Sequence, residues 1–183
     1  MAGLDPAIQD NKRDSLRADA RRLGGRIKCG HDDVRGCRMA YDRNNVFAKI
    51  LRGEIPSIKV YEDEHALAFM DVNPHERGHT LVIPKAEAES LLDLPAASAG
   101  PFLLATQKVA KAVKAALKAP GLMIAQLNGA AAGQTVFHVH FHIIPRMGAD
   151  HMPIKRAIDE GMHGKQADPE ELETIAKLIR AEL

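Results

Sequence analysis

The segment from His138 to Ile144 constrains the fold most strongly, because polar and apolar side chains alternate along it. His138, His140 and His142 occupy every second position, with an apolar residue between each pair. Side chains of a β-strand alternate between the two faces of a sheet, so the pattern predicts a strand over residues 136–144. We expect the apolar residues to pack against the core and the three imidazoles to face outward into a cleft.

Hydrophobic periodicity in the rest of the chain predicts an α+β domain with a five-stranded antiparallel sheet. The other strands are expected at residues 58–61, 66–71, 80–84 and 122–127. A short helix should begin at Asn44 or Asn45 and end at Gly53, a long helix should span 96–118, and a third should pack at an edge over 169–183. Several strand neighbours are joined by short turns, which favours an antiparallel sheet with its helices on one side over βαβ units.

The charged residues divide the chain into an N-terminal segment and the rest. Residues 1–38 hold nine basic and six acidic side chains, against sixteen basic and eighteen acidic in the remainder. We expect residues 1–43 to be a disordered or loosely attached extension, 44–150 the main domain and 151–183 a C-terminal loop and helix. Because Met39 begins MAYDRNN just before the first helix, the extension is hypothesised to be dispensable or an overlong gene prediction. An organelle transit peptide is the alternative, which the six aspartates disfavour.

Composition argues against several classes of protein. The formal net charge of +1 supplies no bulk attraction to nucleic acid or to an anionic membrane. No apolar run approaches the roughly 20 residues that cross a bilayer, and no secretory signal is recognisable. Cys29 and Cys37 are too few for a disulfide scaffold or a four-thiolate zinc site. We therefore expect a cytoplasmic protein that binds neither nucleic acid nor membrane.

Three interpretations of the histidine pattern are open: a solvated strand face, a metal site and nucleophilic catalysis. On one strand the outer two histidines would lie about 13 Å apart, so one zinc ion could bind only two of the three. His79, His65 or Asp71 would have to complete such a site. For catalysis, a neutral imidazole carries a lone pair at pH 7 and needs only orientation. If a backbone carbonyl holds its Nδ1–H, Nε2 is the attacking atom, and neighbouring histidines can donate hydrogen bonds to a phosphoryl group.

A loop of small residues lies directly upstream. Asn128 is followed by two glycines and three alanines, and Gln134 and Thr135 re-enter the strand. Small side chains let backbone N–H groups approach a phosphate closely. Such a loop is often only a connection, so it supports phosphate chemistry only together with the histidines.

The sequence NGAAAGQTVFHVHFHIIPR resembles the His-φ-His-φ-His-φ-φ signature, φ being apolar, of the histidine triad superfamily of nucleotide hydrolases and transferases. The segment FAKILRGEIPSIKVYEDEHALAFMDVNPHERGHTLVIPK is similar to the first half of its nucleotide-binding branch, so the resemblance covers about residues 44–146. It implies a five-stranded antiparallel sheet with one long helix and a homodimer.

The resemblance also implies roles for individual residues. His140 would be the nucleophile that forms a covalent nucleotidyl intermediate, which water then hydrolyses. His138, His142, His79 and Thr135 would assist it. Nucleotide binding is implied for Phe47, Ile50, Phe69, Asp71, Val72, Asn128, Gly133, Gln134 and Thr135, with Asp71 on the ribose hydroxyls. By composition alone the four apolar residues of this set would rather belong to the core.

Many bacterial relatives hold a structural zinc through a C-x-x-C pair and a histidine, but Asn45, Ala48 and Glu87 occupy those positions here. We expect no metal and no cofactor. The predicted activity is hydrolysis of purine nucleoside 5′-phosphoramidates to an AMP-type nucleotide and an amine. A dinucleoside polyphosphate hydrolase is the alternative, since Thr135 and Pro145-Arg146 are similar to that branch. A nucleotide-binding partner protein with incidental turnover and a metal-dependent hydrolase stay open.

Overall fold

The computed structural model describes residues 41–148 and 164–183. Residues 1–40 of the extension expected over 1–43, and residues 151–163 of the expected C-terminal loop, therefore lie outside the described residues. Within the described ranges the strands are β1 (Lys59–Glu62), β2 (Ala66–Met70), β3 (Thr80–Pro84), β4 (Gly121–Ala125) and β5 (Phe141–Arg146). The helices there are α2 (Val46–Leu51), α3 (Ala96–Ala116), α5 (Pro169–Arg180) and the short 3-10 helix η1 (Ala130–Ala132). None of these helices is long and apolar enough to span a membrane.

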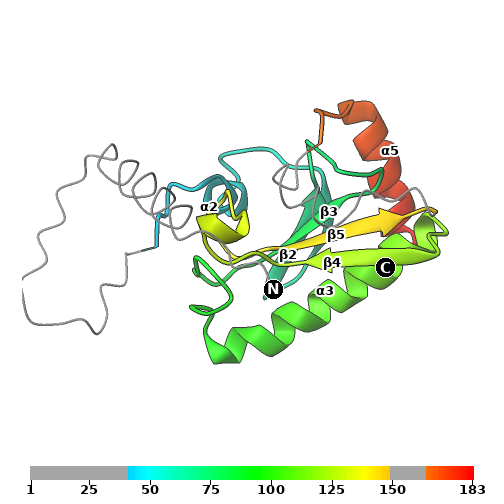
Figure 1. The fold of residues 1–183 in the computed structure, drawn as a ribbon. Helices are drawn as coiled ribbons and strands as arrows, with labels where there is room; N and C mark the ends of the chain where they lie inside the picture. Colours follow the sequence, from blue (N-terminus) through cyan, green and yellow to red (C-terminus); the bar gives the residue numbers. More distant parts are fainter. Residues whose placement is uncertain (1–40, 149–163) are drawn as a thin grey trace, which may run out of the picture. The chain divides into compact units, whose positions relative to one another are not determined.

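The five strands form one antiparallel sheet in the order β1-β2-β3-β5-β4 (Figure 1). This confirms the predicted α+β class. Strand β5 lies between β3 and β4, so the strand that contains His142 is in the interior of the sheet. In its register Leu81 of β3 is opposite His142, and Thr80 is opposite Ile143.

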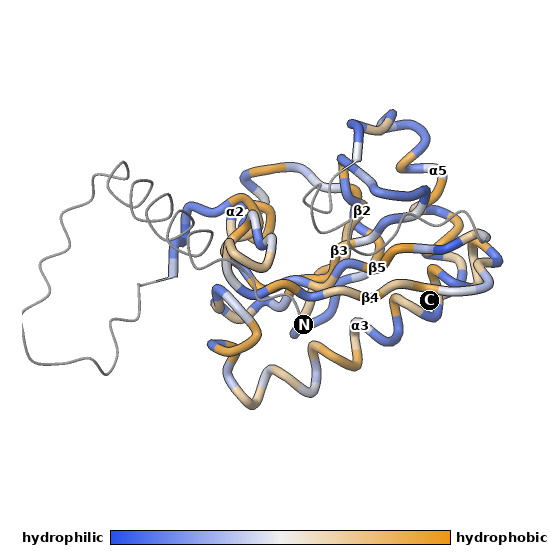
Figure 2. The backbone as a smooth tube through the Cα atoms, viewed as in Figure 1, coloured by the Kyte–Doolittle hydropathy of each residue, from blue (hydrophilic) through white to orange (hydrophobic). Residues whose placement is uncertain are grey.

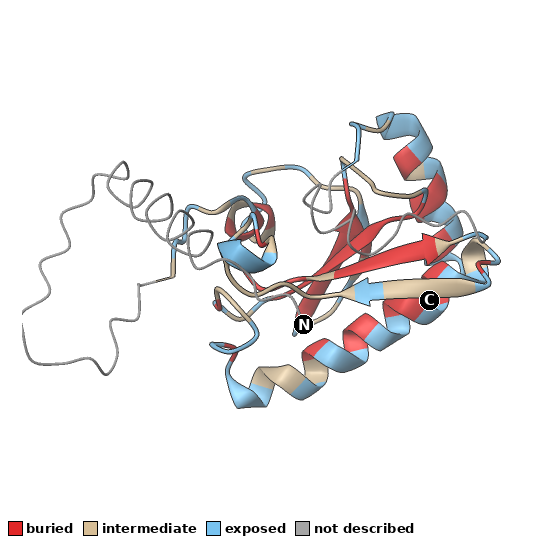
Figure 3. Cartoon of the chain, in the orientation of Figure 1, coloured by how far each residue is buried: buried red, intermediate tan, exposed pale blue. Residues whose placement is uncertain are grey.

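The sheet is covered on both faces, and the expectation that all helices lie on one side was wrong. Helices α3 and α5 pack against one face in a core that includes Ala68, Val82 and Ile143. The short helix α2 packs against the other face, where Phe47 and Phe69 belong to a second apolar cluster. The physical reason is that β2 and β3 are apolar on both faces, so neither face can be left to water. Figure 3 shows these central strands buried, whereas β4 at the edge is largely not.

Helix α3 has the amphipathic pattern that its sequence predicts. Phe102, Val109 and Val113 are buried against the sheet. The tube in Figure 2 accordingly alternates between hydrophobic and hydrophilic colours along this helix. Lys111 lies on the outer side, bonded to Gln107, and Lys108 stacks over the ring of Tyr61 at 4.5 Å. The lysine row is therefore the solvated face of an amphipathic helix.

The strand predicted over residues 136–144 is shorter than expected and begins at Phe141. Residues 136–140 leave the sheet ladder because the N–H of Val139 donates instead to the carbonyl of Ala88. The alternation of side chains nevertheless continues through this segment. Val139 and Ile143 are buried in the core below α3, and Phe141 packs against that core.

Helix α5 packs at the edge of the sheet, as its hydrophobic spacing predicts. Asp168 caps its first turn by accepting from the N–H of Glu170, and Pro169 begins the helix. Its buried side chains, Leu172, Ile175, Ala176 and Ile179, join the core next to α3 and β1.

Replacing Ile175 with alanine should therefore destabilise the whole domain, because this side chain is 1% exposed. The expected loss in the free energy of unfolding is about 2 to 5 kcal/mol. Leu178→Ala in the same helix is the matched control, since Leu178 is 46% exposed. This substitution should change the free energy of unfolding by less than about 0.5 kcal/mol. Urea unfolding measures both variants. Equal effects of the two substitutions would contradict the packing of α5 described above.

Candidate active site

A cavity of about 290 Å³ lies on the α2 side of the sheet. The predicted site residues that line it are Phe47, Ile50, Phe69, Asp71, Val72, Thr135, His140 and His142. The structure thus brings together the apolar residues expected around the base, the carboxylate expected at the ribose and two of the three histidines. Asn128, Gly133, Gln134, His79 and His138 are not among its lining residues.

The walls of the cavity are mostly apolar. Phe47 of α2 meets the ring of Phe69 at 5.6 Å and that of His140 at 5.0 Å, both edge to face. The lining residues that sequence reasoning missed are Val46, Ile55, Pro56, Ser57, Met70, Asn73, Leu81 and Val136. Most are sequence neighbours of predicted residues, but Ile55, Pro56 and Ser57 belong to a connection whose sequence gives no signal of a site.

His140 is held through one ring nitrogen. Its Nδ1 lies 2.7 Å from the carbonyl oxygen of His138. A carbonyl oxygen only accepts, so Nδ1 carries the proton and the lone pair of the neutral ring lies on Nε2. The ring is 4% exposed and lies 4.8 Å from that of His142. This is the orientation that nucleophilic attack through Nε2 requires.

His138 is placed differently from the other two, and the expectation that all three histidines face outward into a cleft was wrong. Its ring is fully buried. Its Nε2 donates to the carbonyl oxygen of Pro84 at 3.0 Å, and its Nδ1 bonds to the hydroxyl of Tyr41. Burial lowers the pKa of His138 to about 4, although the bond to Pro84 acts in the opposite direction. His138 is therefore a neutral structural group at physiological pH.

His79 lies between His142 and Asp71 and is close to both. Nε2 of His79 lies 3.0 Å from Nδ1 of His142. Nδ1 of His79 accepts the backbone N–H of His75 at 3.1 Å and lies 3.3 Å from Asp71 Oδ2. With Nδ1 accepting, the proton of a neutral His79 lies on Nε2 and is donated to His142. The proton of a neutral His142 then lies on its own Nε2.

Among the described residues, Asp71, His79 and His142 also form a group that could hold a metal ion. One ligand atom from each lies within 4.8 Å of the others. His79 lies between the other two and directs a different nitrogen to each. A shared ion would need only one nitrogen of His79, so this group keeps a metal-dependent hydrolase open as an alternative. His65, the other ligand considered, is exposed and pairs with Glu64.

Asn45, Ala48 and Glu87 occupy the positions at which many bacterial relatives hold zinc. Asn45 accepts the N–H of Ala48 and caps α2. Ala48 has no ligand atom. Glu87 pairs with Arg43 at 3.0 Å.

The small-residue loop contains η1, flanked by two glycines in the left-handed region. Gly129 has φ of 83° and Gly133 has φ of 90°, values that an L side chain rarely adopts. The side chain of Gln134 braces the loop by accepting the N–H of Gly129 at 2.7 Å and donating to two backbone carbonyls.

Asn128 also bonds within the protein. It accepts the N–H of Leu91 at 2.9 Å and donates to Gln126. The side chain of Asn128 thus stabilises the conformation of the loop, and so does the buried amide of Gln134. Thr135, at the end of the loop, is the member of this set that reaches the cavity.

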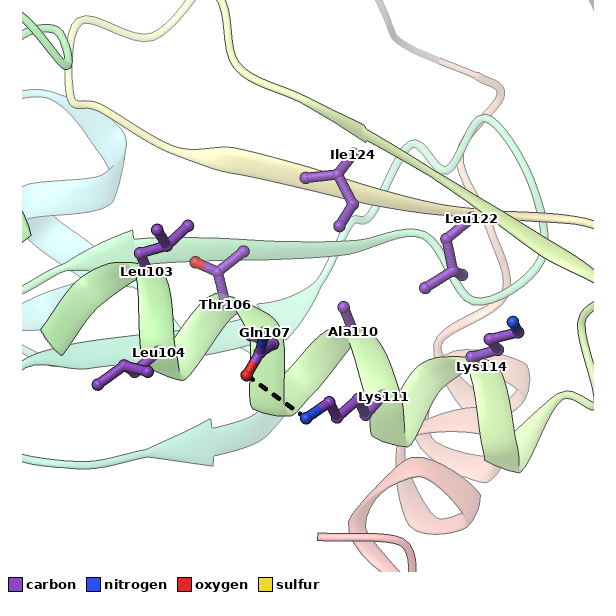
Figure 4. A pocket seen from close by; sticks show the side chains of 9 residues that line it. All are labelled: Leu103, Leu104, Thr106, Gln107, Ala110, Lys111, Lys114, Leu122 and Ile124. Atoms are coloured by element: carbon purple, nitrogen blue, oxygen red, sulfur yellow. Dashed lines mark hydrogen bonds between the residues drawn. The ribbon is translucent and has the colours of Figure 1, made fainter. Parts of the chain in front are cut away.

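A second cavity of about 400 Å³ lies between α3 and the edge strand β4 (Figure 4). Its lining residues are Leu103, Leu104, Thr106, Gln107, Ala110, Lys111, Lys114, Leu122 and Ile124. It contains none of the histidines and is largely apolar, so it offers no catalytic group.

The burial of His138 predicts a pH dependence of stability. Because its pKa of about 4 in the folded protein lies below its unfolded value of about 6.5, the unfolded state binds more protons between these values. The free energy of unfolding therefore has its full value, as far as His138 is concerned, above about pH 6.5. It decreases as the pH falls toward 4, by up to about 3 kcal/mol. NMR titration, with His138→Gln to assign the signal, measures the folded pKa. A value near or above 6 would contradict the neutral, buried His138.

Comparisons with known proteins agree with this geometry. Residues 52–149 match the family model for the HIT domain. Protein hit of Bacillus subtilis is 48% identical over 105 residues, which cover 57% of this chain and 72% of that protein. Adenosine 5′-monophosphoramidase HNT1 of Saccharomyces cerevisiae is 35% identical over 138 residues, 75% of this chain and 82% of the yeast protein.

The fold is also shared with solved structures. The crystal structure of a Hit-like protein from Bartonella henselae superposes with a TM-score of 0.70 at 49% identity, covering 79% of this chain and 99% of that one. Together with the matched family model, which spans more than half of the sequence, this shows that the chain belongs to the HIT domain family.

Proposed function

We propose that this protein hydrolyses purine nucleoside 5′-phosphoramidates to an AMP-type nucleotide and an amine, through a covalent intermediate on His140. The observation that carries the proposal is the hydrogen bond from Nδ1 of His140 to the carbonyl of His138, which leaves the lone pair on Nε2. The name of the yeast relative, an adenosine 5′-monophosphoramidase, supports the substrate class.

The cavity suits a nucleoside monophosphate. Its apolar wall, with Phe47 and Phe69, would pack against the flat base. The carboxylate of Asp71 would accept hydrogen bonds from both ribose hydroxyls. The phosphate would then lie near His140 and Thr135, which line the cavity. The N–H groups of Gly133 and Gln134, also expected at the phosphate, donate within the loop to the carbonyls of Ala130 and Gly129.

In the first step Nε2 of His140 would attack phosphorus while the bond from phosphorus to the amine breaks. The departing amine needs a proton, which the imidazolium form of His142 would donate from Nε2, leaving His142 neutral with its proton on Nδ1. In that form Nδ1–H of His142 would donate to Nε2 of His79, and Asp71 lies beside the other nitrogen of His79. Thr135, which lines the cavity, would contact the leaving group.

In the second step a water molecule would attack the phosphorus of the nucleotidyl intermediate. His142, now without its Nε2 proton, would take a proton from the water, and the bond from phosphorus to His140 would break. The nucleotide leaves and both imidazoles return to their starting forms. The carboxylate of Asp71 lies 3.3 Å from His79. It would stabilise the positive charge that His142 and His79 share during the cycle.

Dinucleoside polyphosphate hydrolysis is the second candidate, and the position of Thr135 in the cavity favours it. Arg146, part of the same resemblance, lies at the end of β5, where it faces Glu76 at 3.6 Å and is not in the cavity. An amine must be protonated as it leaves, whereas a nucleotide need not be. Turnover of adenosine 5′-phosphoramidate compared with diadenosine polyphosphates separates the two activities.

The variant His140→Ala tests the proposed nucleophile. We expect it to lose about 10³-fold or more in kcat, because the covalent step has no substitute, while its affinity for AMP changes little. Steady-state kinetics and calorimetric AMP titration measure the two quantities. Full activity in this variant would contradict the proposal.

Two controls separate the remaining alternatives. Turnover that stops on chelation and returns with added metal would favour a metal-dependent hydrolase. A cellular phenotype that survives in His140→Ala with intact AMP binding would instead indicate a nucleotide-binding partner protein with incidental turnover.

We also propose that the protein is a homodimer that buries the surface around the second cavity. Leu103, Leu104 and Ile124 are 58%, 67% and 48% exposed there. Strand β4 is at the edge of the sheet, and within residues 41–148 and 164–183 no strand covers its outer side. A two-fold axis beside β4 would pair this strand with its own copy and bury both apolar surfaces.

Ile124→Glu should convert the dimer to a monomer, because it places a charge within the apolar contact. Leu92→Glu is the matched control, since Leu92 is 82% exposed and lies outside this surface. Light scattering after size-exclusion chromatography gives the molar mass of each protein. A monomeric wild type, or a dimeric Ile124→Glu variant, would contradict this interface.

A further inference from the structure

Tyr41 makes a contact with the histidine motif that the proposed mechanism does not use. Its hydroxyl bonds to Nδ1 of His138, and the two rings meet edge to face at 5.6 Å between their centres. Tyr41 precedes α2 and is 97 positions away from His138 in the sequence. The contact therefore joins the start of the described domain to its proposed catalytic segment.

The direction of this hydrogen bond follows from the other ring nitrogen. Nε2 of His138 faces the carbonyl oxygen of Pro84 at 3.0 Å and must donate to it. A neutral imidazole has one N–H, so Nδ1 accepts and the hydroxyl of Tyr41 donates. Burial raises the pKa of Tyr41, which keeps that hydroxyl protonated.

The two hydrogen bonds together fix the plane of the His138 ring. The same residue presents its backbone carbonyl to Nδ1 of His140 at 2.7 Å. A ring held at both nitrogens restrains the residue whose carbonyl orients His140. Tyr41 is thus two hydrogen bonds away from the proposed nucleophile.

Neighbouring residues of the same segment also act on Tyr41 or fix its position. Asn45, the cap of α2, acts on the Tyr41 hydroxyl by lowering its pKa against the effect of burial. Glu87 and Arg43 form an ion pair that joins the same segment to the chain after β3. These contacts include two of the three positions, Asn45 and Glu87, at which many bacterial relatives hold zinc.

We propose that Tyr41 is a positioning residue for the hydrolytic reaction: through His138 it fixes the carbonyl that sets the tautomer of His140. This inference rests on the proposed function of His140. Its test therefore includes a measurement that does not depend on turnover.

The variant Tyr41→Phe removes one oxygen atom and keeps the ring contact. Without the donor, Nδ1 of His138 is a buried acceptor that a proton can satisfy, so the pKa of His138 should rise from about 4 toward its ordinary value. The other charged or titratable groups acting on the pair are His140, Glu87, Asp42 and Arg52. Imidazole ¹⁵N chemical shifts report the tautomer and the pKa directly.

In the same variant we expect kcat for adenosine 5′-phosphoramidate to fall about ten-fold with KM changed less than two-fold, since Tyr41 does not line the cavity. Tyr61→Phe is the matched control. It removes the other tyrosine hydroxyl of the chain, which donates to Asp63, and should leave the His138 signals and kcat unchanged. Thermal unfolding of both variants verifies that each is folded at the assay temperature.

Unchanged ¹⁵N shifts of His138 in Tyr41→Phe would overturn the proposal, and so would changed shifts with an unchanged kcat. A wild-type protein that turns over neither phosphoramidates nor dinucleoside polyphosphates would reject the proposed function, and with it the catalytic role of Tyr41. In that case a changed ¹⁵N shift of His138 in Tyr41→Phe would still show the hydrogen bond between Tyr41 and His138. Failure of the proposed function can therefore be distinguished from failure of the inference about Tyr41.

Discussion

The hydrogen bond between Nδ1 of His140 and the carbonyl oxygen of His138, at 2.7 Å, determines where the lone pair of the proposed nucleophile lies. That carbonyl belongs to residues 136–140, which leave the strand ladder. The N–H of Val139 bonds to Ala88, and its side chain is buried in the core below α3. His138 is held at both ring nitrogens. The proposed chemistry therefore depends on packing from both faces of the sheet.

Much of this arrangement could be predicted from the sequence, because period-two alternation and helical spacing are local properties. The sheet, its five strands, the N-cap at Asn45, the left-handed Gly53 after the end of α2 and the edge position of α5 follow from them. The side on which the residues of the site gather also follows, since Val139 and Ile143 take the opposite face. The resemblance to the histidine triad superfamily, rather than composition, identified Phe47 as a wall of the cavity.

What could not be predicted depends on contacts between distant segments. The start of β5 at Phe141 is set by a backbone bond to Ala88. Helix α2 covers the second face of the sheet because β2 and β3 are buried on both faces. The alternation of side chains in a single strand does not reveal this. Tyr41 gives no sequence signal, because its partner His138 is 97 positions away. The use of Gln134 as a brace for its own loop is likewise visible only in three dimensions.

The central claim is a transient covalent bond between phosphorus and His140, and it can be observed directly. The protein is mixed with adenosine 5′-phosphoramidate, quenched in alkali within the first turnover, digested and analysed by peptide mass spectrometry. Alkali preserves a bond between phosphorus and an imidazole nitrogen. The account predicts an adenylyl group on His140 in the wild type and none in His140→Ala. An active wild type that carries the adenylyl group on another residue, or that carries none at any quench time, would contradict it.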